Sequence, residues 1–199
     1  ILGKVIASKN VRNWPYKVPN QEYWEFLSFH YCDNLTISGG GKIDGRGYHW
    51  WILCLLNYKK YLPNESARPH MMHFYRCRNT VIHDLVLKNS AQFHIKMDDC
   101  NKAEIYNLDI KVNTTAQINL LKHFSLEGVI PMFPFNTDGI DPHGSNMHIY
   151  NLNVQNWDDV VLPKPGSRSD MYDYCTQNYL VENCTVVLGV GMTIGSISP

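Results

Sequence analysis

The stretch that decides the fold is Asn79-Thr-Val-Ile82-His-Asp-Leu85-Val-Leu87, a short run with aliphatic side chains at regular positions. Its pattern returns further along the chain, as Ile105-Tyr-Asn-Leu108-Asp-Ile110, Ile149-Tyr-Asn-Leu152-Asn-Val154 and, more weakly, Val181-Glu-Asn-Cys184-Thr-Val186. Measured from Ile82, the copies follow one another at steps of 23, 44 and 32 residues. We interpret the second step as two periods of 22 and the third as one period with an insertion of about ten residues.

A repeat of this length, built from short β-rich runs and turn residues, is typical of a coiled chain of stacked strands. Leucine-rich repeats share the period, but their Leu-x-x-Leu-x-Leu consensus is not sustained here. No window keeps a helical periodicity over three turns, which disfavours a mainly helical protein. We therefore predict an all-β fold, a right-handed single-stranded parallel β-helix. Two ladders should point inward and stack: Ile82/Ile105/Ile149 and Leu85/Leu108/Leu152.

The overall composition limits the classes of partner. The 199 residues include 18 basic and 18 acidic side chains, a net charge of zero, and they contain no basic run. We therefore expect no nucleic-acid partner and no membrane partner. The longest apolar run, Trp50 to Leu56, is too short to span a bilayer.

Two features favour an extracellular location. Glycosylation sequons begin at Asn34, Asn64, Asn113 and Asn183, which is a high number for a chain of this length. Six cysteines, an even number, are compatible with an oxidising compartment, and their spacing does not fit a zinc site. We expect the protein to be secreted and glycosylated.

Cysteine spacing also suggests a disulfide. Cys77 and Cys100 lie one period apart, and stacked strands about 4.8 Å apart are within reach of disulfide geometry. Cys32 occupies an equivalent turn, so a ladder of unpaired thiols stays open as the alternative.

The candidate catalytic acids lie between Asn136 and Gly166. Asn136-Thr-Asp138 precedes an alternating apolar run, and the pair Asp158-Asp159 follows it. Asp138 and Asp158 are 20 positions apart, close to one period, which would bring Asp138, Asp158 and Asp159 together on one face. Such close carboxylates cannot all stay ionised, so the pKa of at least one should rise. A protonated carboxyl group beside ionised ones suits an acid–base hydrolase.

Several motifs occur in an order that resembles the polygalacturonase family of pectin hydrolases, glycoside hydrolase family 28. They are Gly41-Lys-Ile-Asp-Gly-Arg-Gly47 with Trp50-Trp51, Arg68-Pro69, Asn136-Thr-Asp138, Asp158-Asp159 and Gly189-Val-Gly-Met-Thr-Ile-Gly-Ser196. The resemblance covers nearly the whole chain, and it implies a right-handed parallel β-helix and inverting hydrolysis without a metal. No cofactor is expected.

Residue roles follow from the same resemblance. Asp158 would be the general acid that protonates the glycosidic oxygen, and Asp138 and Asp159 would be the bases that activate water. Asn136 would bind the neighbouring sugar. Lys164 would either contact a substrate carboxylate or be solvated.

The chain departs from the family pattern at two places. The histidine of the family's Gly-His-Gly motif is Val190 here, and the family's Arg-x-Lys motif, which binds the substrate carboxylate, would lie beyond Pro199. We therefore expect residues 1–199 to form a single β-helix domain that is incomplete at its C-terminal end, with the N-terminal end left open. The protein should be a monomer, or associated with the remainder of its own chain.

Other residues with functional potential are given structural roles. We expect Asp98-Asp99 to form a solvated turn, His143 and Arg168 to have ordinary loop roles, and Trp50-Trp51 to be a buried packing pair rather than a sugar platform.

The favoured function is acid–base hydrolysis of an α-glycosidic bond in an acidic, galacturonate-containing polysaccharide. The alternative is a catalytically inactive β-helix that serves as a glycan-binding or structural module. A β-helix pectate lyase is a third, disfavoured reading, because it needs a calcium site and an arginine base.

Overall fold

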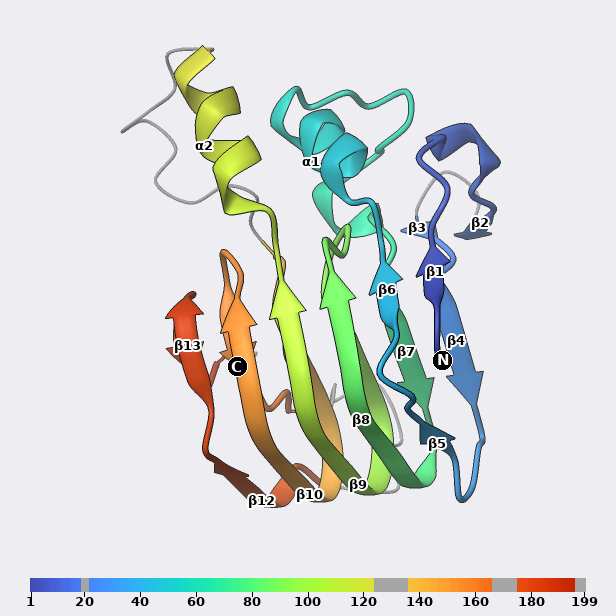
Figure 1. Ribbon diagram of the computed structural model, residues 1–199. Helices are drawn as coiled ribbons and strands as arrows, with labels where there is room; N and C mark the ends of the chain where they lie inside the picture. The colour runs from blue at the N-terminus through green and yellow to red at the C-terminus, as the bar shows by residue number, and fades with distance from the viewer. Residues whose placement is uncertain (19–21, 124–135, 166–174, 196–199) are drawn as a thin grey trace.

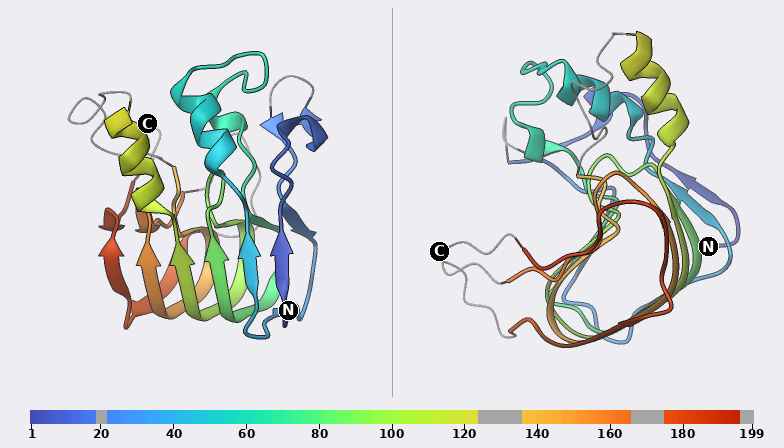
Figure 2. Two further views of the ribbon diagram at one scale, coloured as in Figure 1. Left: turned by 45° about the horizontal axis from the view of Figure 1, so that its top comes forward. Right: turned by 90° about the vertical axis from the view of Figure 1, so that its left-hand side faces the viewer.

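The chain winds into a coil of parallel strands, which a computed structural model describes for residues 1–18, 22–123, 136–165 and 175–195 (Figure 1). Twelve strands of the described residues form one sheet in which every pair is parallel. Viewed along the coil axis, the rungs superpose into a ring (Figure 2). The predicted all-β parallel β-helix is confirmed.

The first half of the chain holds the shorter elements. They are β1 (Lys4–Ile6), the 3₁₀ turn Val11–Asn13, β2 (Tyr16–Val18), β3 (Glu22–Tyr23), β4 (Leu27–His30), β5 (Thr36–Ile37), β6 (Lys42–Asp44), α1 (Tyr48–Leu55), the 3₁₀ turn Glu65–Ala67, β7 (Met72–Tyr75) and β8 (Arg78–Lys88). Only β2 and β3 pair antiparallel among the described strands, as a small separate hairpin.

The second half holds the longest strands and the last rungs. They are β9 (Ile95–Lys111), α2 (Thr114–His123), β10 (Ile140–Gln155), β11 (Asp159–Val161), β12 (Gln177–Glu182), β13 (Thr185–Leu188) and β14 (Gly191–Met192). Both α-helices lie outside the coil, beyond the same end of the long strands (Figure 1).

The core consists of aliphatic ladders that run along the coil axis. Ile82 pairs in register with Ile105 and Ile105 with Ile149, and the leucines of the repeat pair in the same way. All six side chains of these two ladders are at most 2% exposed. In a strand, successive side chains point to opposite faces, so the intervening positions face outward. The predicted interior ladders are confirmed.

One reading of the spacing was wrong. Ile105 and Ile149 lie on neighbouring rungs, because β9 pairs directly with β10, so the step of 44 residues is one rung and not two. The additional length includes α2. It also includes residues 124–135, which lie outside the described residues. An insertion that leaves the coil at a turn and returns to it does not change the register. Spacing alone therefore cannot distinguish it from an extra rung.

Asparagine recurs because the turns need a left-handed backbone. Asp84, Asn107 and Asn151 take φ angles of 53°, 51° and 52° at equivalent positions of three rungs. Asparagine and aspartate tolerate this region better than other residues with a side chain. Their side chains also bond along the ladder: Asn107 Nδ2 donates to Asp84 Oδ1 (3.0 Å) and Asn151 Nδ2 donates to Asn107 Oδ1 (3.2 Å).

Cysteines stack in register, but they do not form disulfides in the described residues. Cys32, Cys77 and Cys100 occupy the same turn on three rungs, as predicted. Their thiols bond to main-chain carbonyls instead: Cys77 Sγ to Phe29 O (3.3 Å) and Cys100 Sγ to Phe74 O (3.5 Å). The structure therefore contains the thiol ladder and not the predicted disulfide.

The tryptophan pair lies on α1 and is buried where this helix packs on the coil. Trp50 and Trp51 are each 1% exposed, and Trp51 Nε1 donates to Ser90 O at 3.2 Å. The predicted packing role is confirmed. Among the described residues, no helix is both long enough and apolar enough to cross a bilayer.

A core substitution tests the ladders. Ile105→Ala should lower the free energy of unfolding by about 2–5 kcal/mol, because it leaves a cavity between two rungs. Val81→Ala, on the outward side of the neighbouring strand, is the control and should cost about 1 kcal/mol or less. Urea denaturation measures both, and equal losses would contradict the assignment of Ile105 to the core.

Candidate functional site

Two neighbouring rungs bring the acidic motifs together. Asp138 lies just before β10 and Asp159 begins β11, and the N–H of Gly139 donates to Asp159 O at 2.9 Å. Carboxylate oxygens of Asp138, Asp158 and Asp159, here called the carboxylate cluster, lie within 4.8 Å of one another. The predicted convergence is confirmed. Such a spacing would also suit a cation, so the expectation of a metal-free site stays a prediction.

Backbone donors fix the position of Asp158. The N–H of Asn136 donates to its Oδ2 at 2.6 Å, and the N–H of Asp159 donates to its Oδ1 at 3.0 Å. The side chain of Asp158 is half-buried, and each of its two oxygens accepts one of these backbone hydrogen bonds. The two acidic motifs therefore position each other directly.

Asn136 is oriented by a buried arginine whose contact the sequence did not reveal. Arg68 is 2% exposed, and its Nη2 donates to Asn136 Oδ1 at 2.7 Å. A second donor, Arg68 Nη1, reaches Ala91 O at 3.1 Å. The position of Arg68 before Pro69 was the only signal in the sequence.

The pKa of Asp138 rises to about 9. Burial is the largest cause, since the side chain is 3% exposed, and the negative charges of Asp141 and Asp158 add to it. In the protein at neutral pH, Asp138 therefore holds a proton. The expectation that one carboxyl pKa in this cluster rises is confirmed.

Asp141 is a fourth acid that the sequence analysis missed. Burial raises its pKa to about 7, together with the charges of Asp159 and Asp158, although the nearby Lys164 opposes the rise. A signal was present: Ile140 belongs to the core ladder, so the next residue of the strand must face outward, toward the cluster.

Lys164 binds Asp141 rather than standing free in solvent. Its Nζ lies 3.1 Å from Asp141 Oδ2, and the side chain of Asp141 is only 1% exposed. The ammonium also lies 5.4 Å from the centre of the Phe93 ring. Removal of Lys164 from this position would leave a buried carboxylate without its cation.

His94 supports the main chain at Asp138. Its Nδ1 donates to Asp138 O at 2.9 Å, and the N–H of Ser90 donates to its Nε2 at 3.4 Å. Complete burial lowers the pKa of His94 to about 4, so the imidazole is neutral in this position. The sequence analysis did not single out this residue.

Asp98 and Asp99 each form ion pairs with basic side chains, so the prediction of a solvated turn was wrong. Asp99 is 1% exposed, its Oδ2 lies 3.0 Å from Arg76 Nε, and its N–H donates to His143 Nδ1 at 2.9 Å. His143 is buried within β10, so the expected loop role was wrong, and its Nδ1 binds the main chain of the neighbouring rung. The opposite charge of Arg76 on the neighbouring rung explains why Asp99 can be buried.

A charged network extends the outer face beyond the carboxylate cluster. His73 Nε2 donates to Asp98 Oδ2 at 2.7 Å, and His73 Nδ1 lies 3.2 Å from Glu25 Oε1. Lys96 Nζ lies 3.2 Å from Asp98 Oδ2. These groups come from three consecutive rungs, which the network ties together.

Val190 lies beside the cluster, as predicted. Its N–H donates to Asp158 O at 3.0 Å, and its side chain is 51% exposed. An isopropyl group offers no hydrogen bond where the family pattern has an imidazole.

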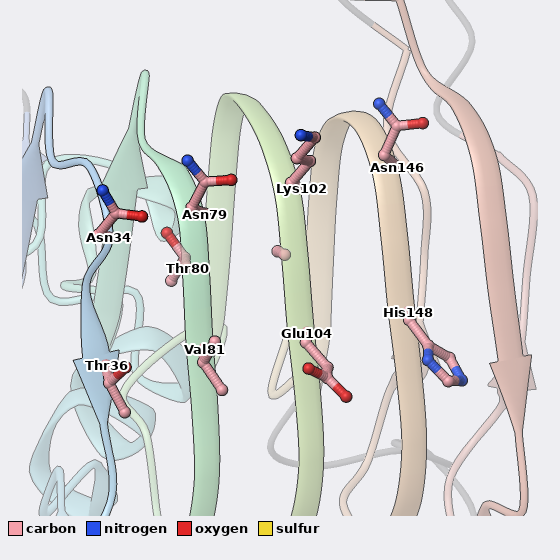
Figure 3. Close-up of a pocket in the computed structure, with 10 residues that line it drawn as sticks. Asn34, Thr36, Asn79, Thr80, Val81, Lys102, Glu104, Asn146 and His148 are labelled. Carbon is pink, nitrogen blue, oxygen red and sulfur yellow. The ribbon is translucent and has the colours of Figure 1, made fainter.

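The predicted glycosylation sites are at the surface. Asn34, Asn64, Asn113 and Asn183 are all exposed. Asn34 and Thr36, from the first sequon, also line a hollow of about 580 Å³ on another part of the coil (Figure 3). No residue of the carboxylate cluster lines this hollow. Arg168, for which we expected a loop role, lies outside the described residues.

Comparison with known proteins gives a consistent result. The profile described as Glycosyl hydrolases family 28 matches residues 4–199. A polygalacturonase of Persea americana is 29% identical over 99% of this chain, and polygalacturonase-2 of Solanum lycopersicum is equally similar over the same share. Each alignment covers 36% of the relative, so the chain spans about a third of these proteins. The solved polygalacturonase of Erwinia carotovora ssp. carotovora, 24% identical, superposes with a TM-score of 0.75 over 97% of this chain and 50% of its own.

Stability should depend on pH through His73. Burial lowers the pKa of His73, but hydrogen bonds to Asp98 and Glu25 outweigh burial and raise it above its usual 6.5. This contribution is fully present below about pH 6.5 and is lost as the pH rises through the raised value. The carboxyl pKa values of Glu25 and Asp98 are lowered, because their bonds to His73 outweigh burial, so their contributions are lost in acid.

The stability difference between the wild type and His73→Gln should therefore be widest between about pH 5 and 6.5 and shrink in alkali. Urea denaturation across this range measures it. A difference that is constant with pH would contradict the protonated state of His73.

Asp138→Asn should stabilise the protein. The folded state resists ionisation of Asp138 while the unfolded state does not, so the wild type loses stability as the pH rises from about 4 to about 9. The gain from the substitution should grow over this range and exceed about 1 kcal/mol at pH 7. Asp109→Asn is the matched control. Hydrogen bonds from Lys111 and Asn153 outweigh burial and lower the pKa of Asp109, so this substitution should lower the stability instead of raising it. A gain from Asp138→Asn that does not grow with pH contradicts the buried proton.

Proposed function

The chain belongs to glycosyl hydrolases family 28, and from this we propose that it hydrolyses α-glycosidic bonds of a galacturonate-containing, pectic polysaccharide. The observation that carries the proposal is the carboxylate cluster, where three acids converge within 4.8 Å and the pKa of one rises to about 9. Glycosidases need one carboxylic acid to protonate the leaving oxygen and one carboxylate to activate water. Asp138 supplies the protonated form at neutral pH.

We assign the general acid to Asp158 and the bases to Asp138 and Asp159, following the motif order. In the unbound protein the proton resides on Asp138 instead. Because the carboxyl groups interact, the protonation of Asp138 depends on the charge of Asp158. A substrate that places its glycosidic oxygen at Asp158 would draw this proton across, and Asp138 would then be ionised and ready to accept a proton from water.

The stereochemical outcome is proposed to be inversion. In this reaction one water attacks the anomeric carbon from the face opposite to the leaving group, with Asp138 or Asp159 taking its proton. Inverting glycosidases usually hold their carboxyl groups about 6.5–9.5 Å apart, farther than here. Inversion therefore follows from the family, and NMR of the newly released anomer tests it separately.

Asn136 and Lys164 have proposed substrate contacts. Arg68 occupies Asn136 Oδ1, which directs the amide N–H donors of Asn136 away from Arg68 and makes them suitable for a sugar hydroxyl. Lys164 faces the cluster through its ion pair with Asp141. A substrate carboxylate could reach Lys164 only by sharing the ammonium with Asp141.

The setting of this activity is also a proposal. Four exposed sequons and the plant relatives fit a secreted, glycosylated protein that acts on cell-wall polysaccharide as a monomer or with the remainder of its own chain.

One observation favours a second candidate function. Val190 replaces the imidazole of the family motif and is 51% exposed beside Asp158. A β-helix that binds the polysaccharide without cutting it is the alternative that this replacement supports.

Asp158→Asn separates the two functions. An amide cannot donate the proton that the leaving oxygen requires, so the release of reducing ends from polygalacturonan or rhamnogalacturonan should fall about a hundredfold or more. Asp109→Asn, an acid on another strand segment of the outer surface, is the control and should keep full activity.

Two outcomes would change the assignment. Equal activity of the wild type and Asp158→Asn would remove Asp158 from the role of acid. Binding of polysaccharide without hydrolysis by either protein would support the binding module.

A further inference from the structure

We propose that Lys96 binds a substrate carboxylate one rung before the carboxylate cluster, and so makes the protein select an acidic sugar at that position. This inference rests on the proposed pectic substrate. It adds a binding residue that the motif order did not indicate, since the sequence pointed to Lys164 as the carboxylate ligand.

The register of the strands places Lys96 in line with the site. Lys96 pairs with His73 on the preceding rung and with Asp141 on the following one. The flanking Ile95 and Met97 belong to the core, so the side chain of Lys96 faces outward on the same face as Asp141. A polysaccharide that runs along the coil axis past the cluster would therefore pass over Lys96.

The charge balance of this face requires a cation for an anionic substrate. Because Asp138 holds a proton, the other acids of this face, Asp98, Asp141, Asp158 and Asp159, stand against His73, Lys96 and Lys164 among the described residues, so the face has no surplus of positive charge. A polymer with a carboxylate on each sugar would be repelled unless an ammonium group pairs with it.

Lys96 can change partner more readily than Lys164. Its present partner, Asp98, also accepts a hydrogen bond from His73 at 2.7 Å, so Asp98 stays paired when the ammonium turns to a ligand. Asp141, by contrast, is only 1% exposed, and loss of Lys164 would leave a buried charge. The side chain of Lys96 is also the more exposed of the two, at 33% against 24%.

The test compares Lys96→Met, Lys96→Arg and Lys111→Met in the full-length protein. Lys111 is a matched control, since it pairs with Asp109 two residues away just as Lys96 pairs with Asp98, but farther along β9 and away from the cluster. The probes are a linear oligogalacturonate of defined length and its methyl ester. Calorimetry gives Kd, steady-state kinetics gives KM and kcat, and thermal unfolding checks the fold.

Lys96→Met should weaken binding of the acidic oligomer about tenfold, the loss of one charge-assisted hydrogen bond. KM should rise while kcat changes little, because the contact lies away from the bond that breaks. The methyl ester should bind to the wild type and to Lys96→Met equally. Lys96→Arg should retain most of the affinity, and Lys111→Met all of it.

Two results would overturn the inference: unchanged affinity of Lys96→Met for the acidic oligomer, or an equal loss for the acid and the ester. A wild type that binds without cleaving refutes the proposed hydrolysis, and the Kd values alone then decide the role of Lys96. A wild type that neither binds nor cleaves refutes both.

Discussion

Parallel stacking in register is the constraint on which the rest of this structure depends. Each rung donates its backbone hydrogen bonds to the next, so equivalent residues are held about 4.8 Å apart along the axis. Aliphatic residues gain from this arrangement because the ladders of Ile82 and Leu85 exclude water between the rungs that they join. Asparagine gains as well, since its amide bonds to the residue above in the turn. One geometric rule thus accounts for both the core and the turns.

The same rule is unfavourable for charges, because it brings like groups close together. Parts of the outer face resolve this by placing opposite charges on successive rungs, as in Glu25, His73 and Asp98 or in Asp141 and Lys164. In the carboxylate cluster the protein keeps a proton on Asp138. Electrostatic strain is therefore concentrated where the proposed chemistry needs a proton donor beside a base.

The residues around the carboxylate cluster form two groups, one buried and one partly exposed. Arg68 and His94 are buried and bind Asn136 and the carbonyl of Asp138, so they set the geometry of the turn that carries the first acid. Val190 and Lys96 are partly exposed and lie on either side of the acids, where the proposed ligand would bind. Selectivity for a particular pectic backbone would be decided by this second group, because its contacts can change without loss of the fold.

The sequence by itself determined the rung pattern, the inward ladders and the meeting of Asp138 with Asp158 and Asp159. These follow from local periodicity, and stacking converts each repeat directly into a contact. It did not determine that the step of 44 residues is a single rung, because an insertion outside the coil leaves the register unchanged. It also missed Asp141, His94 and the contact of Arg68, it misjudged Asp99, and it left open whether the stacked cysteines form a disulfide. Burial, pairing and protonation at those positions depend on which side chains the neighbouring rungs supply, and only the tertiary structure brings those side chains into contact.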